Sequence, residues 1–172
     1  MWRWRCLVLR MFGARIGTPC DVRGSAQVWF PPNLELSDRS MLAAGVNCYN
    51  VALVRLGSGS IVSQGAYLCT ASHDVHKPDF PLLARPITIA ADCWIASEAF
   101  VGPGVTIDEG AVLAARAVAM RDLDAWTIYV GNPAKPVRKR SHNALDLAAC
   151  PTRKTVGVLG ARLEDYIGSQ RP

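Results

Sequence analysis

Two histidines in one short, proline-rich segment are the residues best suited to chemistry in this chain. His73 and His76 lie in CTASHDVHKPDFPLLARP, residues 69–86, which contains three prolines and interrupts an otherwise regular pattern. A histidine is a natural general base for removing a proton from an alcohol near neutral pH. We therefore predict that His73 is a catalytic base; a solvated loop histidine is the alternative.

The residues beside His73 are candidates for contacting a substrate. Asp74 could also orient the His73 imidazole, although adjacent side chains usually point apart, and His76 could simply be exposed. A zinc site with three histidine ligands would need His73, His76 and His142, the three histidines of the chain. We expect no bound metal.

A strict six-residue repeat supplies the framework that must position these residues. Aliphatic residues open five consecutive blocks of six, at Ile89, Ile95, Val101, Ile107 and Leu113. Neither a helix nor a simple alternating strand produces this period. It is typical of a parallel β-helix, in which each block is a short strand plus a turn and three blocks close one triangular coil. We predict an all-β solenoid with coils about 4.8 Å apart.

The repeat also predicts the organisation of the chain. The solenoid should occupy residues 16–130, with imperfect early coils whose two-residue shifts indicate longer corners. Residues 69–88 cannot stay in the wall and should project as a loop, and such insertions usually build a binding face. Residues 131–172 should form a basic segment and an irregular tail, since two prolines disfavour a helix near residue 133 and the periodicity ends at residue 141.

The N-terminal residues 1–15 are predicted to form an amphipathic cap. Trp2–Phe12 is expected to be a short helix with Trp4, Val8, Met11 and Phe12 on one face. A solenoid needs a cap over its terminal strand edges. The alternative is a membrane-surface anchor, because tryptophan and arginine suit the interface. Without a convincing secretory signal or a run of about 20 apolar residues, we expect a cytoplasmic protein, or one at the inner face of the plasma membrane.

Charge and cysteine usage narrow the function further. The formal net charge of +5 is concentrated near the N-terminus and again between Lys135 and Arg140, which indicates local anion sites. The basic cluster lacks interleaved aromatic residues and a nucleic-acid-binding fold, so we expect no nucleic-acid partner. The six cysteines show no C-x-x-C pair and are interpreted as small buried hydrophobic residues.

Four motifs, together with the repeats, carry a resemblance to a known family. YNVAL (49–53), SQGAYLCTASHD (63–74), DCWIAS (92–97) and YVGNPAKPVRKR (129–140) closely resemble the hexapeptide-repeat O-acetyltransferases. The nearest group is the colanic acid biosynthesis acetyltransferases, relatives of the nodulation, maltose and galactoside acetyltransferases. The resemblance implies a left-handed β-helix, a homotrimer with active sites between subunits, acetyl-CoA as donor, and a sugar or lipid-linked saccharide as acceptor.

The resemblance also implies individual roles. His73 matches the catalytic base, and Asn50 matches an asparagine that helps to hold the acceptor hydroxyl. Trp94 lines the donor site, and the backbone N–H of Ser97 matches the group placed against the thioester oxygen, where it would stabilise the oxyanion. The remaining implied cofactor contacts are Ala96, Ala114, Arg121, Lys135, Arg138 and Lys139. Among the basic residues, Arg121 matches one near the cofactor, and the other three match the basic end that meets the CoA phosphates.

Several alternatives stay open at this point. Asn50 could cap a turn or join a ladder of corner residues, Trp94 could pack at a subunit contact, and the basic cluster could be solvated surface. Alanines stand where the family usually has glycines, at Ala96 and Ala114, which would narrow the donor groove. Other functions compatible with the pattern are a xenobiotic acetyltransferase, a zinc-dependent carbonic anhydrase and a non-catalytic scaffold.

Overall fold

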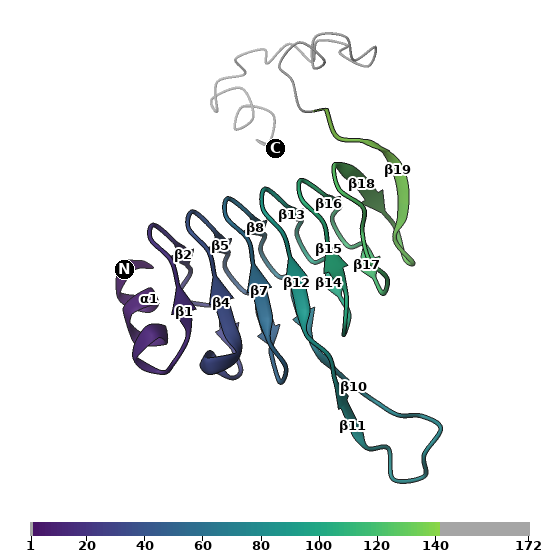
Figure 1. Cartoon of the computed structure of the whole chain (residues 1–172), viewed down its shortest axis with the longest axis horizontal. Helices are drawn as coiled ribbons and strands as arrows, with labels where there is room; N and C mark the ends of the chain where they lie inside the picture. The colour runs from purple at the N-terminus through teal and green to yellow at the C-terminus, as the bar shows by residue number, and fades with distance from the viewer. Residues whose placement is uncertain (1, 142–172) are drawn as a thin grey trace, which may run out of the picture. The chain divides into compact units, whose positions relative to one another are not determined.

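The computed structural model describes residues 2–141, and these form a parallel β-helix with a projecting hairpin and one short helix (Figure 1). This confirms the fold class that the six-residue repeat predicts. The predicted irregular tail, with His142, lies outside the described residues.

Three sheets make the three faces of the prism. Face A consists of β1 (Arg15–Ile16), β4 (Leu34–Leu36), β7 (Val54–Leu56), β12 (Ile87–Ile89) and β15 (Thr106–Ile107). Face B consists of β2 (Asp21–Val22), β5 (Met41–Leu42), β8 (Ile61–Val62), β13 (Trp94–Ile95), β16 (Val112–Leu113), β18 (Thr127–Val130) and β19 (Lys135–Lys139). Face C consists of β3 (Gln27–Val28), β6 (Asn47–Tyr49), β9 (Tyr67–Cys69), β14 (Phe100–Val101) and β17 (Val118–Ala119).

The chain visits the faces in the order A, B, C, and the corner from C to A varies in length. Ile16 pairs with Leu36 and Leu36 with Leu56, each 20 residues further along, whereas Ile89 and Ile107 are 18 residues apart. The extra residues of the early coils lie at the C–A corner, where the first coil contains a short 3-10 helix, η1 (Pro31–Asn33). The two-residue shifts in the repeat are therefore caused by longer corners, as predicted.

The interior of the prism is a stack of aliphatic side chains from successive coils. The five predicted block openers from Ile89 to Leu113 are each no more than 1% exposed. The fifth positions are small because they face the same narrow interior, and Ala99, Ala111 and Ala117 are fully buried there. The six-residue period therefore places apolar side chains of successive coils in contact along the axis of the prism.

The predicted insertion is an antiparallel hairpin at the C–A corner of the third coil, made of β10 (Ala71–His73) and β11 (Leu82–Ala84). Figure 1 shows it projecting away from the prism. Its base is anchored by Thr70, a fully buried residue whose hydroxyl donates to the Tyr49 carbonyl at 2.9 Å. The hairpin therefore starts from a fixed point of the wall.

Helix α1 (Trp2–Met11) covers the N-terminal end of the prism, against β1 and β2. Three of the four residues predicted to share one face of the helix are exposed rather than packed on the prism. Trp4, Met11 and Phe12 are 67%, 76% and 67% exposed, whereas Cys6 and Leu9 are buried in the core. At 100° per residue, positions 6 and 9 lie opposite positions 4 and 11, and these smaller side chains pack against the end of the first coil.

The C-terminal end is closed by β19, which pairs antiparallel with β18. The basic segment predicted as part of a tail is thus an edge strand of face B. Arg140 follows it and donates from Nη1 to the carbonyl oxygens of Asp92 and Gly110, at 2.6 and 3.0 Å. These bonds tie the end of β19 to the turns of two earlier coils.

Candidate active site

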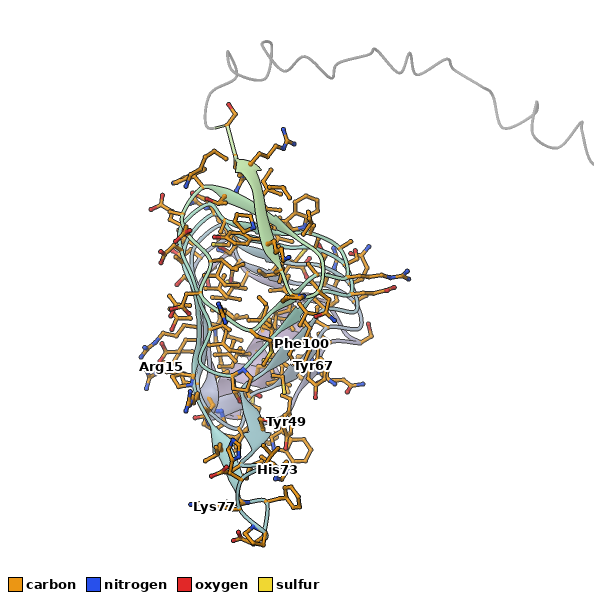
Figure 2. All side chains as sticks on the ribbon, turned by 90° about the vertical axis from the view of Figure 1, so that its right-hand side faces the viewer. Arg15, Tyr49, Tyr67, His73, Lys77 and Phe100 are labelled. Atoms are coloured by element: carbon orange, nitrogen blue, oxygen red, sulfur yellow. The ribbon has the colours of Figure 1, made fainter. Side chains whose placement is uncertain are left out.

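The imidazole of His73 is held by a backbone carbonyl across the hairpin. His73 is the last residue of β10, its side chain is exposed, and its Nδ1 lies 2.5 Å from the carbonyl oxygen of Phe80. Figure 2 shows His73 on the hairpin, at one corner of the prism seen along its axis.

This contact decides which nitrogen of the neutral ring is free. A carbonyl oxygen can only accept a hydrogen bond, so Nδ1 must carry the proton. Nε2 is then the unprotonated nitrogen, available to take a proton from a hydroxyl group. The same carbonyl also stabilises the imidazolium that forms afterwards, because Nδ1–H stays bonded to it.

Phe80 is a site residue that sequence reasoning missed. Its backbone has φ 43°, in the left-handed region that a non-glycine residue rarely adopts. Its N–H donates to the Lys77 carbonyl at 3.1 Å, which closes the turn before it. Backbone strain of this kind persists where the surrounding structure holds it and gathers at functional sites. No sequence signal pointed to this conformation, because the following Pro81 favours extended backbone at Phe80 rather than the left-handed region.

Asp74 does not orient the imidazole. Its Oδ1 accepts a hydrogen bond from the backbone N–H of His76 at 3.1 Å, and its own N–H donates to the Pro81 carbonyl at 3.0 Å. Asp74 therefore shapes the tip of the hairpin, while the Phe80 carbonyl performs the role considered for it. His76 is exposed on the same tip.

Asn50 is fully buried at the C–A corner of the second coil. Its Nδ2 donates to the Phe30 carbonyl at 2.8 Å, and its Oδ1 accepts from the Phe30 N–H at 3.0 Å. This is the corner-ladder alternative that the sequence left open, and it links two coils beneath the hairpin. The direct contact between Asn50 and an acceptor stays a prediction.

The residues predicted to bind the donor gather on face B and at the B–C corner. Trp94 is 48% exposed on face B, and its indole Nε1–H donates to the hydroxyl of Ser63 at 2.9 Å. Ala96 and Ala114 follow β13 and β16, so they lie one above the other at the corner, joined by the Ala96 N–H bonded to the Leu113 carbonyl at 2.9 Å. Trp94, Ala96 and Ala114 therefore lie near one another on the structure, and their contact with the donor stays a prediction.

The backbone N–H of Ser97 is available at this corner. Among residues 2–141 no acceptor bonds it, while the Ser97 carbonyl accepts from the Arg116 N–H at 3.0 Å. Arg116 also forms an ion pair with Glu98 at 2.6 Å, so a charged pair flanks this turn. Ser97 can therefore offer an N–H to a developing oxyanion.

The predicted basic contacts divide between two places. Lys135, Arg138 and Lys139 lie on β19 and are exposed, which continues face B beyond Trp94. The Nζ of Lys139 donates to the Thr127 hydroxyl at 2.8 Å. Arg121 instead follows β17, at the C–A corner, and so lies on a different edge of the chain from Trp94. The resemblance implied separate roles for them, with Arg121 near the cofactor and the three cations of β19 facing the CoA phosphates.

Within one chain, the base and the donor residues lie at opposite edges of face C. His73 leaves the prism at the C–A corner, whereas Ala96, Ser97 and Ala114 occupy the B–C corner. Face C, with Tyr67 among its outward residues, lies between them. The two halves are thus separated by one whole sheet of the prism.

The cysteines confirm their predicted structural role. Four of the described cysteines are buried and a fifth is half-buried, all of them as free thiols: Cys6, Cys20, Cys48, Cys93 and Cys69. Burial raises the pKa of the Cys48 thiol to about 12, which keeps it protonated and unreactive.

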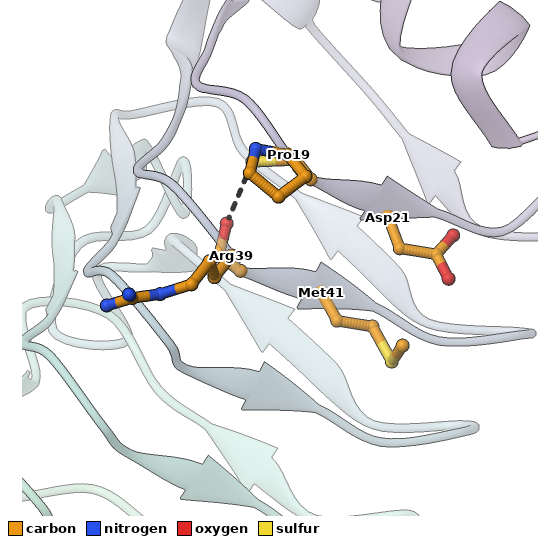
Figure 3. A pocket seen from close by; sticks show the side chains of 6 residues that line it. Pro19, Asp21, Arg39 and Met41 are labelled. Carbon is orange, nitrogen blue, oxygen red and sulfur yellow. Dashed lines mark hydrogen bonds between the residues drawn. The ribbon is translucent and has the colours of Figure 1, made fainter.

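Two further features bear on the search for a site. A shallow hollow lies at the A–B corner of the first two coils, where Pro19, Asp21, Arg39 and Met41 are among the lining residues (Figure 3). It contains none of the predicted site residues and lies at another corner from His73.

Within the described part of the chain, no cluster of three or more metal-ligating side chains occurs. Over the same residues, no helix is long and apolar enough to cross a membrane.

Comparison with known proteins places this site in a family. No family model matches the chain. WcaF of Escherichia coli strain K12, a colanic acid biosynthesis acetyltransferase, is 41% identical over 140 residues, which cover 81% of this chain and 77% of WcaF. A chloramphenicol acetyltransferase of Agrobacterium fabrum strain C58 is 46% identical over 106 residues, covering 49% of this chain and 51% of that protein.

Solved structures agree on the fold. A hexapeptide-repeat acetyltransferase of Vibrio cholerae, complexed with acetyl-CoA, has a TM-score of 0.77 at 23% identity, covering 81% of this chain and 78% of that one. A maltose O-acetyltransferase of Clostridium difficile has a TM-score of 0.75 at 21% identity, covering 81% and 76%. The prism of six-residue repeats is that of the hexapeptide-repeat acetyltransferases. With the identity to WcaF, the chain belongs to this family and is an acetyltransferase.

Proposed function

We propose that this acetyltransferase moves the acetyl group of acetyl-CoA to a hydroxyl of a sugar or lipid-linked saccharide in surface polysaccharide synthesis. The observation that carries the proposal is the His73 ring, whose Nδ1 is bonded to the Phe80 carbonyl and whose Nε2 is left to act as a base. The similarity to WcaF supports the acceptor class.

The chemistry is a direct transfer. His73 Nε2 takes the proton of the acceptor hydroxyl while the hydroxyl oxygen bonds to the thioester carbon. The Ser97 N–H stabilises the resulting oxyanion, a contribution of about 3 kcal/mol in comparable sites. The C–S bond then breaks and His73 returns the proton to the CoA thiolate. No acyl-enzyme forms, so no serine or cysteine nucleophile is required.

The donor half fits acetyl-CoA. Small side chains at Ala96 and Ala114 leave space for a thin pantetheine arm along the B–C corner. The exposed cations of β19, Lys135 and Arg138, continue the same face and suit the CoA phosphates. Trp94, fixed by its bond to Ser63, provides an apolar wall beside this path.

A homotrimer would complete the site, because the two halves of one chain lie at opposite edges of face C. In a closed ring each chain presents one edge to each neighbour, so His73 of one subunit can face the donor corner of the next. The outward side chains of faces B and C support this assembly, since they include Ile61 and Trp94, which are 40% and 48% exposed.

Aromatic side chains near the hairpin support a saccharide acceptor. Trp29 and Tyr49 form an edge-to-face pair with ring centroids 5.5 Å apart, and Tyr67 and Phe100 form another at 5.4 Å. In Figure 2, Tyr49, Tyr67 and Phe100 lie on the side of the prism from which the hairpin with His73 projects. Aromatic surfaces of this kind combine an apolar face with polar edges and suit the C–H faces of sugars.

The test is thiol release from acetyl-CoA in the presence of an oligosaccharide, for wild type and for His73→Ala. Loss of the base should lower kcat by about 10²- to 10⁴-fold. Val75→Ala, on the same hairpin and 70% exposed, is the matched control and should retain most activity. Near-normal turnover by His73→Ala would refute the proposal.

A xenobiotic acetyltransferase is the second candidate, favoured by the 46% identity to a chloramphenicol acetyltransferase. It would share the donor and the base and differ in the acceptor. Chloramphenicol and the oligosaccharide compared at equal concentration in the same assay distinguish the two. A higher kcat/KM for chloramphenicol would favour this candidate.

A further inference from the structure

Helix α1 has two apolar faces, and the structure uses only one of them. The inner face, with Cys6 and Leu9 buried, holds the helix on the first coil. The outer face carries Trp4, Leu7 and Met11, which are 67%, 46% and 76% exposed. At 100° per residue these three form one stripe along the helix, opposite the buried positions.

The helix does not depend on the outer face for its attachment. Arg10 donates from Nε to the Ile16 carbonyl at 2.9 Å and from Nη2 to the Gly17 carbonyl at 2.7 Å. Arg5 donates from Nη2 to the Ala26 carbonyl at 2.8 Å. With the buried inner face, these bonds fix α1 to the prism. The large apolar side chains on the outer face therefore have no role in the packing of residues 2–141.

The exposed apolar surface continues past the end of the helix. Phe12 is 67% exposed, and Gly13 after it lies against Pro32, so close that a Cβ there would be 3.1 Å from the proline Cγ. Pro32 belongs to the corner segment that also contains Phe30, which is 48% exposed. The patch thus spans the outer stripe of α1 and the adjoining C–A corner.

The charge of the helix identifies the partner. Its sequence, WRWRCLVLRM, contains three arginines and no acidic residue. Arg5 and Arg10 bond to uncharged oxygens, so neither is neutralised by an ion pair within residues 2–141. A second copy of the same face would bring like charges together, which is unfavourable. A partner with negative charge at its surface and an apolar layer beneath it matches both the positive charge and the exposed apolar side chains of α1.

We propose that the outer face of α1, with Phe12, docks onto an anionic lipid bilayer. The helix would lie in the plane of the interface with Trp4, Leu7 and Met11 among the acyl chains, and its net positive charge would be attracted by the anionic headgroups. Tryptophan is favoured at that depth.

Docking would place the C–A edge of the prism near the bilayer. Phe30 lies on this edge in the first coil, Asn50 in the second, and the hairpin with His73 in the third. Two coil spacings amount to about 10 Å. A saccharide whose lipid end stays in the membrane could therefore extend along this edge to His73. This consequence rests on the proposed function, whereas the docking itself does not.

Vesicle sedimentation of the full chain tests the docking without any activity measurement. The probes are vesicles of phosphatidylcholine alone and of phosphatidylcholine with phosphatidylglycerol in a three-to-one mixture. Wild type should bind the anionic vesicles, and added salt should weaken this binding. The double variant Trp4→Ser, Met11→Ser should bind them about tenfold less or weaker still.

A matched control removes two equally exposed apolar side chains elsewhere. Val75 and Val137 are 70% and 54% exposed, on the hairpin and on β19. The double variant Val75→Ser, Val137→Ser should bind vesicles like wild type. Equal binding by the α1 variant, or no binding by wild type, would overturn the proposal. A smaller oligomer for the α1 variant in light scattering would assign the face to another copy and overturn it as well.

Discussion

Face A and face B are built from the same coils, yet their outward side chains differ in kind. Successive outward partners on face A are Arg15, Glu35, Arg55, Thr88 and Thr106. On face B the corresponding ladder from the second coil onward is Met41, Ile61, Trp94 and Val112. One face therefore suits water and the other suits contact with protein.

Face C resembles face B from its middle coils onward. Its outward ladder is Asn47, Tyr67, Phe100 and Val118. The inward residues of all three faces are the same kind of aliphatic column, so the fold itself does not require the difference. The difference is consistent with the association through faces B and C that we propose, since His73 and the donor residues lie next to these faces. Face A contributes neither half of the site.

Mixing two inactive variants tests most directly whether each active site combines residues of two chains. His73→Ala lacks the base and Ala114→Trp blocks the donor corner, so each homotrimer should be nearly inactive. In trimers assembled from equal amounts of both chains, about a quarter of the sites combine an intact His73 with an intact donor corner. Coexpression should therefore restore about a quarter of wild-type turnover, an increase of about 25- to 2,500-fold over His73→Ala.

The control for this experiment is coexpression of His73→Ala with His73→Asn, which share the same defect. This pair should remain inactive. Failure of the first pair to regain activity, with mixed trimers verified by two affinity tags, would show that both halves of a site belong to one chain.

An arginine in place of one outward residue of face B should disrupt the proposed trimer, whereas an arginine at an outward position of face A should not. Ile61→Arg places a charge in a predicted subunit contact, at a cost of about 3–5 kcal/mol per unpaired buried charge. The expected result is a monomer in light scattering. Thr106→Arg, at an outward position of face A, is the control and should keep the wild-type size. An unchanged size for Ile61→Arg would exclude face B from the interface.

The contrast between faces shows which parts of the fold a sequence can predict. The six-residue period follows from the interior, where one narrow column demands an aliphatic residue in every block. The strands, the corners and the projecting segment at His73 could all be predicted from it. The orientation of α1 could not, because both of its faces are apolar and only the shape of the first coil selects Cys6 and Leu9.

The candidate site, too, could be predicted from the sequence only in part. His73 could be proposed as a base from its residue type and its place at the start of the projecting segment, whereas the donor residues come from the resemblance to the family. The bond between the Phe80 carbonyl and Nδ1 of His73 depends on one backbone angle in an eight-residue turn, and no residue pattern predicts it. The position of Arg121, away from Trp94, depends on which corner of the triangle each residue reaches.

The hairpin allows a finer test, because it alone brings a base to the edge of face C. Phe80→Val should disfavour the left-handed backbone, since a branched Cβ is unsuited to positive φ, and so displace the carbonyl from Nδ1. We expect kcat to fall about tenfold with little change in KM. Phe80→Gly removes the ring but tolerates the backbone angle, and it should retain most of the activity. Equal losses for the two variants would mean that the ring, not the carbonyl, matters.

The smallest effect is expected from the ion pairs that keep face A polar. The hydrogen bond from Arg55 Nε to Glu35 Oε2, at 2.7 Å, and the charges of Arg55 and Arg15 hold the pKa of Glu35 below its usual value. A lowered pKa in the folded state stabilises the fold above the unfolded pKa, and this contribution disappears as the pH falls through the folded value. Since both arginines are largely exposed, it should not exceed about 1 kcal/mol.

Glu35→Gln should therefore lower the urea midpoint slightly at pH 7, and the two curves should converge in acid. Glu109→Gln, an exposed position without an ion pair among the described residues, is the control and should follow wild type at every pH. A difference for Glu35→Gln that persists at a pH where Glu35 is protonated would mean that packing, rather than charge, sets its contribution. The polar side chains of face A would then serve solubility rather than stability. The difference between the two faces would depend only on the apolar residues of face B.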